Sequence, residues 1–179
     1  MIPFMRDLAR LVRREDPNHL ISSGYSSPRP AAQHLRRAAG KGDWTEDSPA
    51  EAEAYLRDTH PDPIDLLSIH FYPGVDNLRF GNKDRDSAAA LPPLKRICDR
   101  VGKPVYIGET GALVGGGAEC PAFTRNLLRE AAAAGYPLVL YWFGAGDTPL
   151  DFDLTRSAGE VKALREAGRQ MGGVGHSER

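Results

Sequence analysis

Hydrophobic residues recur along the chain at two spacings, which predict alternating helices and strands. Within residues 3–15, Phe4, Leu8, Leu11 and Val12 recur every three or four positions and so share one face of an amphipathic helix. Later helices are predicted over residues 48–58, 88–101, 121–135 and 157–171. The first and last of these begin with the capping-box pairs Ser48/Glu51 and Ser157/Glu160.

Four short apolar runs, starting near residues 20, 65, 104 and 138, predict strands that alternate with these helices. The run over residues 65–72 is nearly continuous, as in a strand buried on both faces of a parallel sheet. Alternating strands and helices predict an α/β fold with right-handed crossovers. The chain is expected to form one domain over residues 1–172, with a disordered tail at 173–179.

The strand–helix units are somewhat longer than one strand and one helix need, and the extra residues lie in loops after the strands, notably residues 29–47 and 73–86. Parallel α/β enzymes keep their chemistry at this end of the sheet. A third such loop contains Gly115-Gly116-Gly117, but it lacks the Lys-Ser/Thr of a phosphate-binding loop.

Composition and charge narrow the class of protein. Hydrophobic residues make up 41% and charged residues 26% of 179, the balance of a folded globular domain. A net charge of -1 argues against nucleic acid or an anionic membrane as the main partner. No apolar run reaches the roughly 20 residues that span a bilayer. The early charges Arg6 and Asp7 are unlike a signal peptide, so a cytoplasmic location is predicted if Met1 is the true start.

The cysteines and other metal-binding residue types show no ligand spacing. Cys98 and Cys120 form no CxxC motif, so free thiols are expected, with a single bridge as the alternative. No cluster of His, Asp and Glu is readable as a metal site. Neither a metal nor a cofactor is therefore predicted.

Polar and aromatic residues stand at the ends of the last three predicted strands: His70 and Tyr72, then Glu109, then Trp142. The carboxyl ends of parallel strands share one edge of the sheet, so these four side chains are expected to converge there. Taken singly, each has an ordinary structural interpretation. Trp44, in the long polar loop, is a second aromatic candidate, although anchoring of that loop explains it equally well.

Three segments carry a family resemblance. Ser68-Ile69-His70-Phe71-Tyr72-Pro73, Lys103-Pro104-Val105-Tyr106-Ile107-Gly108-Glu109-Thr110-Gly111 and Leu140-Tyr141-Trp142 resemble strands six, seven and eight of clan A glycoside hydrolases, above all family 5, the cellulases and mannanases. The resemblance covers about residues 17–170. It implies a TIM-barrel-type fold and retaining cleavage of β-glycosides in oligo- or polysaccharides.

The same resemblance implies roles for the four residues. Glu109 matches the nucleophile, His70 and Tyr72 match the pair that binds substrate and orients the nucleophile, and Trp142 matches the tryptophan beneath the sugar. The family's acid/base is the glutamate of an Asn-Glu pair on strand four, and the chain has no Asn-Glu dipeptide. The resemblance therefore implies a half-barrel of four βα units, strands five to eight, without the acid/base.

A half-barrel leaves its inner face and the edges at 20–24 and 137–143 without partners. The chain is therefore expected to belong to a longer protein, to self-associate, or to be marginally stable. Two alternatives to a glycosidase remain open at this point. One is a non-catalytic remnant or carbohydrate-binding module, and the other is an unrelated α/β enzyme using Ser68 and His70 or Asp147.

Overall fold

The computed structural model describes residues 2–39, 41–72, 87–111, 120–142 and 158–172. The helices are α1 (Ile2–Glu15), α2 (Ala32–Arg37), α3 (Pro49–Thr59), α4 (Ser87–Val101), α5 (Cys120–Ala133) and α6 (Ala158–Gly172). The strands are β1 (Leu67–His70), β2 (Val105–Thr110) and β3 (Val139–Tyr141).

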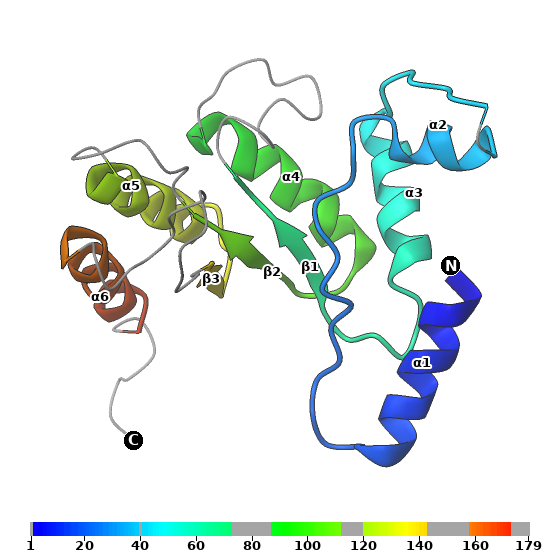
Figure 1. Cartoon of the computed structure of the whole chain (residues 1–179), viewed down its shortest axis with the longest axis horizontal. Helices are drawn as coiled ribbons and strands as arrows, with labels where there is room; N and C mark the ends of the chain where they lie inside the picture. Colours follow the sequence, from blue (N-terminus) through cyan, green and yellow to red (C-terminus); the bar gives the residue numbers. More distant parts are fainter. Residues whose placement is uncertain (1, 40, 73–86, 112–119, 143–157, 173–179) are drawn as a thin grey trace, which may run out of the picture.

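The three strands form one parallel sheet in the order β1-β2-β3, and the helices follow one another around it in an arc from α2 to α6 (Figure 1). One face of the sheet packs against the helices. There Leu67, Ile69, Val105 and Ile107 are almost fully buried among residues of α3, α4 and α5. The alternation of strands and helices and the parallel pairing agree with the predicted α/β class.

The first of the four predicted strands, at residues 20–24, is not a strand of this sheet. It contributes one isolated parallel bridge, between Ser22 and Leu66. Its serines instead bond to side chains: Ser22 Oγ lies 2.8 Å from Tyr106 Oη, and Ser23 Oγ lies 2.9 Å from His60 Nε2. Four complete βα units are therefore not observed in the described chain.

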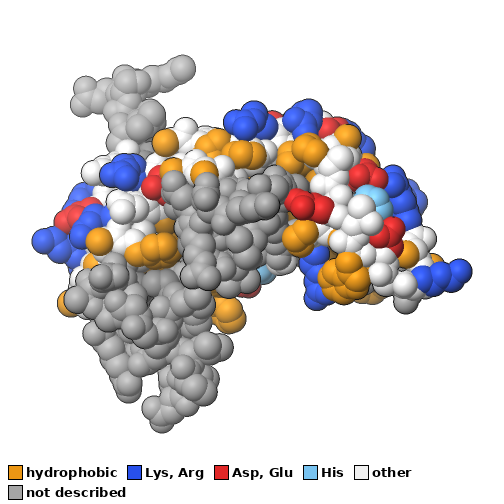
Figure 2. Space-filling view, turned by 90° about the horizontal axis from the view of Figure 1, so that it is seen from above, with side chains coloured by type: hydrophobic (Ala, Val, Ile, Leu, Met, Phe, Trp, Pro, Cys, Tyr) orange, Lys and Arg blue, Asp and Glu red, His pale blue; other side chains and the backbone are white. Residues whose placement is uncertain are grey.

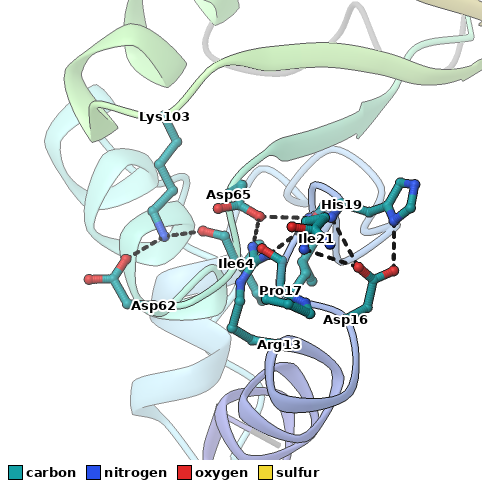
Figure 3. A network of polar contacts seen from close by, with 10 residues as sticks. Arg13, Asp16, Pro17, His19, Ile21, Asp62, Ile64, Asp65 and Lys103 are labelled. Atoms are coloured by element: carbon teal, nitrogen blue, oxygen red, sulfur yellow. Dashed lines mark hydrogen bonds and ion pairs between the residues drawn. The ribbon is translucent and has the colours of Figure 1, made fainter.

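A polar network nevertheless holds this segment in place beside the C-terminal end of α1 (Figure 3). The Asp65 carboxylate accepts hydrogen bonds from the Arg13 guanidinium and from the Ile21 backbone N–H, the latter at 2.7 Å. The backbone N–H of Asp65 donates to Ile21 O at 2.9 Å. Arg13 also donates to His19 O at 2.8 Å, so α1 and the segment after it are fixed to the start of β1.

The helices agree closely with the predicted ones, because their boundaries depend on local signals. Ser48 and Glu51 form the expected reciprocal capping box, with Pro49 opening α3. Gly102 and Gly135 end α4 and α5 at φ +86° and +85°, a region that glycine adopts without strain. The second capping-box serine, Ser157, the loop 73–86, the glycine run 115–117 and the tail 173–179 lie outside the described residues.

On the face shown in Figure 2, Lys and Arg side chains are interspersed with Asp and Glu side chains, and hydrophobic side chains are visible in several groups. Among the described helices, none combines the length and the apolar character needed to cross a membrane.

Candidate active site

An irregularity in the pairing of β2 with β1 places Glu109 on the face of the sheet that is turned away from the helices. Ile107 faces the helices and is fully buried, so strict alternation would also turn Glu109 toward them. Ile69 lies opposite Ile107, but the next residue of β1, His70, lies opposite Glu109. The residue in between, Gly108, is extra on β2. This bulge turns Glu109 onto the same face as His70.

Glycine is required at the bulge because the neighbouring strand is very close. A Cβ atom on Gly108 would lie 2.5 Å from Ser68 Oγ, 3.4 Å from Tyr106 Cε2 and 3.7 Å from His70 Cδ2. The Ser68 hydroxyl is fully buried and has no hydrogen-bond partner among the described residues. Packing against Ser68 therefore favours glycine at position 108 of the motif.

The Glu109 carboxylate is held through one of its two oxygens. Tyr72 Oη donates a hydrogen bond to Glu109 Oε2 at 3.1 Å, and His70 Nδ1 lies 3.2 Å from the same atom. Glu109 Oε1 has no hydrogen-bond partner in the described part of the chain. The Glu109 side chain is 35% exposed, so it is accessible to a molecule above the sheet edge.

An aromatic side chain adjoins this group. The ring of Trp142, just after β3, lies edge-on to the ring of Tyr72, with centroids 6.2 Å apart and an interplanar angle of 70°. Trp142 is 48% exposed and its backbone N–H donates to Thr110 O at 2.7 Å. The structure thus brings together the four residues that stand at the ends of the last three predicted strands.

Backbone contacts around the site hold the strand ends in register. Thr110, fully buried, donates from Oγ1 to Phe71 O at 2.7 Å, and the Phe71 N–H donates to Glu109 O at 2.9 Å. Ser27, from the loop after the first predicted strand, donates its hydroxyl to His70 O. Sequence inspection did not identify Ser27 or Thr110, because their partners are backbone carbonyls of other segments.

Two solved structures are similar to this chain in fold. An endo-β-1,4-mannanase from Thermotoga petrophila superposes with a TM-score of 0.62 at 15% sequence identity, over 99% of this chain and 41% of its own. A hyperthermostable endo-1,4-β-D-mannanase from Thermotoga petrophila RKU-1, solved with maltose and glycerol, gives 0.63 at 18% identity, over 94% of this chain and 51% of its own. The chain has a glycoside-hydrolase-like α/β fold.

The chain spans about half the length of the mannanases it matches. At such identities the likeness concerns the fold alone. No family model and no curated protein sequence matches the chain.

The residues of the alternative α/β enzyme are not assembled into a site in the described structure. Ser68 and His70 lie on the same face of β1, yet Ser68 Oγ makes no hydrogen bond to the His70 ring there. Asp147 lies outside the described residues. Trp44 is 68% exposed in the loop between α2 and α3 and has no recorded ring contact with Tyr72 or Trp142 in the part of the chain described.

A second polar cluster, which the sequence did not reveal, joins α2, α3 and the loop between them. His34, Asp47 and Glu51 bring together donor atoms that lie within 4.8 Å of one another. Buried Asp47 accepts the backbone N–H groups of Gln33 and His34 at 2.7 and 3.1 Å, and its Oδ1 lies 2.7 Å from His34 Nδ1. This bond to Asp47 raises the pKa of His34.

The carboxylates of this cluster are already occupied by the chain. Glu51 accepts the Ser48 backbone N–H at 3.1 Å and the Arg37 guanidinium at 2.7 Å. The Asp47 carboxylate accepts the backbone N–H groups of Gln33 and His34 in the first turn of α2. These contacts give the cluster a structural role, because they fasten the polar loop to α2 and α3.

A cavity of about 260 Å³ lies between the segment at 25–29 and the helices α2 and α3. His60 borders it, and its ring lies edge-on to Tyr25 with centroids 5.7 Å apart. His60 Nδ1 donates to Leu56 O at 2.9 Å, which leaves Nε2 to accept the Ser23 hydroxyl. Burial lowers the pKa of His60, in keeping with a neutral ring.

Proposed function

We propose that the chain is the nucleophile-bearing part of a retaining β-glycoside hydrolase that acts on β-linked oligo- or polysaccharides. One observation carries this proposal: Glu109 is held by Tyr72 and His70 through Oε2 alone, while Oε1 has no described partner. A carboxylate in this arrangement is oriented by one oxygen and free to attack with the other.

In the proposed reaction, Glu109 Oε1 forms a bond to the anomeric carbon as the glycosidic C–O bond breaks. The Tyr72 hydroxyl, already hydrogen-bonded to Oε2, fixes the direction of the attacking carboxylate. The half-exposed Trp142 ring offers an apolar surface to the C–H face of the sugar. The glycosyl-enzyme ester would then be hydrolysed by water.

The leaving oxygen needs a proton, which retaining enzymes take from a second carboxyl group about 5–5.5 Å from the nucleophile. Glu109's described side-chain partners are a phenol and an imidazole, and the sequence lacks an Asn-Glu pair. We therefore propose that the acid/base comes from βα units outside these 179 residues. The chain alone should react with activated aryl glycosides and scarcely with natural linkages, whose leaving groups need protonation.

The same geometry favours a second candidate function. The exposed Trp142 beside Tyr72, with no carboxyl group among the described side-chain partners of Glu109, suits a carbohydrate-binding module that turns nothing over. Binding of β-1,4-mannan oligosaccharides that weakens in Trp142→Ala, without covalent labelling, would support this candidate instead.

A mechanism-based reagent distinguishes the two. We would incubate the chain with a dinitrophenyl 2-deoxy-2-fluoro-β-mannoside, whose leaving group needs no acid, and map the modified residue by peptide mass spectrometry. Labelling at Glu109 is expected. It should vanish in Glu109→Gln and persist in Glu46→Gln, an exposed glutamate in the loop before α3. Equal labelling in Glu109→Gln would show that another group is the nucleophile.

A further inference from the structure

The cluster of His34, Asp47 and Glu51 has one feature that its structural role does not use. The Nδ1 atom of His34 lies 2.7 Å from Asp47 Oδ1, and the Nε2 atom of the same ring lies 3.7 Å from Glu51 Oε1. Both ring nitrogens therefore face carboxylate oxygens. Nε2 itself has no hydrogen-bond partner in the described part of the chain.

This arrangement leaves a lone pair directed at a carboxylate. A neutral imidazole has one N–H donor and one lone pair, and a carboxylate only accepts hydrogen bonds. The short contact with Asp47 therefore fixes the N–H of His34 at Nδ1. The lone pair of Nε2 then faces the Glu51 carboxylate, which is repulsive unless a proton or a metal cation lies between the two atoms.

From this arrangement we propose that His34 Nε2 and Glu51 Oε1 bind one Zn²⁺ ion. In zinc sites the ligating histidine commonly donates its other ring N–H to a carboxylate, which fixes the orientation of the ring. Asp47 holds His34 in that way, and the backbone N–H groups at the start of α2 fix the Asp47 carboxylate in turn. None of these residues belongs to the group around Glu109, so this inference and the glycosidase proposal can fail separately.

The separation of the two atoms suits a shared zinc ion. Zn–N bonds of about 2.0–2.1 Å and Zn–O bonds of about 2.0–2.2 Å, at a tetrahedral angle, place two ligand atoms about 3.3–3.5 Å apart. The observed 3.7 Å between Nε2 and Oε1 needs a closure of only a few tenths of an ångström. The side chains of His34 and Glu51 are 20% and 24% exposed, so water can reach the proposed ion and complete its coordination.

The charges around the His34 ring also favour a cation. The pKa of this ring is raised by the hydrogen bond to Asp47 and by the charges of Glu51 and Asp43. The opposing group is the Arg37 guanidinium, which donates to Glu51 Oε1 at 2.7 Å. The Arg37 side chain is 57% exposed, so it can turn into water at little cost when a metal ion takes its place.

Calorimetric titration of the intact chain with ZnCl₂, slightly above neutral pH, tests the site. His34→Gln and Glu51→Gln should each lose one bound ion or bind it at least about tenfold more weakly than the parent chain. Glutamine serves as well as glutamate in a capping box, so Glu51→Gln keeps the contact with Ser48 and the start of α3. Ca²⁺ and Mg²⁺, which prefer oxygen ligands, should not displace the zinc ion.

Two other histidines provide matched controls. His19 makes the same 2.7 Å contact with an aspartate, but it belongs to no three-residue cluster of metal-binding groups in the described chain. His70 lies beside Glu109. His19→Gln and His70→Gln should both bind Zn²⁺ like the parent chain. Undiminished binding in His34→Gln and Glu51→Gln, or loss of the ion in His70→Gln alone, would overturn the proposal.

The opposite effect is expected from Arg37→Ala. This variant removes the cation that competes for Glu51 Oε1, so it should bind Zn²⁺ several-fold more tightly than the parent chain. Binding weaker than that of the parent would contradict a zinc site at this oxygen.

Nitrogen NMR of the unmodified chain covers the case in which the variants do not fold. Zn²⁺ has to displace a proton from His34 Nε2, so its affinity should fall as the pH falls through the raised pKa of this ring. Added Zn²⁺ should move the Nε2 resonance of His34 and abolish its titration, while the ring of His19 stays unchanged. A His34 ring that titrates identically with and without saturating Zn²⁺ would refute the site.

Discussion

Replacement of Gly108 by alanine tests whether the bulge that turns Glu109 depends on the close approach of β1 and β2. The new Cβ would lie 2.5 Å from Ser68 Oγ, 0.9 Å less than the 3.4 Å at which ordinary contact begins. Ser68 is fully buried, so its hydroxyl has to find new room within a packed interior. Overpacking of this kind costs about 1–3 kcal/mol.

The partner variant Ser68→Ala turns this into a double-mutant cycle. Its hydroxyl is buried without a described partner, so its removal relieves an uncompensated polar group and should be neutral or stabilising by up to about 1 kcal/mol. In the Ser68→Ala background the atom that Gly108→Ala would strike is gone. The double variant should therefore lie close to the parent, with a coupling energy of about 1–2 kcal/mol between the two sites.

Urea unfolding followed by circular dichroism at one fixed protein concentration measures these differences. With a slope of about 2 kcal/mol per molar urea, Gly108→Ala should lower the midpoint by about 1 M. Gly168→Ala is the matched control, because nothing lies within 4 Å of its new Cβ on α6, and it should be neutral or slightly stabilising. An equal cost of Gly108→Ala in both Ser68 backgrounds would refute the reasoning.

Three further predictions concern buried groups. Asp47→Ala removes the acceptor for two backbone N–H groups of α2 and should cost about 1–3 kcal/mol of unfolding free energy, whereas exposed Glu46→Ala should cost almost nothing. Burial raises the pKa of the Cys98 thiol to about 12, so in the folded chain it should not react with iodoacetamide at pH 8 and should react only after unfolding. Rapid labelling of Cys98 in the folded chain, located by mass spectrometry, would contradict this. Burial lowers the pKa of His60, so below about pH 6.5 the unfolded chain binds a proton at this residue and the folded chain does not. The free energy of unfolding should therefore fall as the pH falls, and it should fall less steeply in His60→Gln. Equal slopes of the urea midpoint against pH in the two proteins would argue against this.

Local patterns determined most of the helices and the class of the fold. Signals that act over four residues or fewer can be recognised in the sequence alone. They are the apolar spacing of residues 3–15, the capping box at Ser48 and the glycines at 102 and 135, and they correspond to α1, α3 and the ends of α4 and α5. The alternation of apolar runs with helices likewise implied a parallel sheet. The convergence of His70, Tyr72, Glu109 and Trp142 followed from the shared direction of parallel strands.

Contacts between distant segments decided the rest. The pairing offset at Gly108 sets the direction of Glu109, and it depends on how β1 approaches β2, which no local period of two can encode. The His34–Asp47–Glu51 cluster forms because α2 and α3 pack side by side. Residues 20–24 were predicted to be a strand but form a single bridge to Leu66, and their serines bond to the side chains of Tyr106 and His60, which lie far away in the sequence. A strand's hydrogen bonds come from other segments, whereas a helix makes its own, so tertiary structure alone determines a sheet edge.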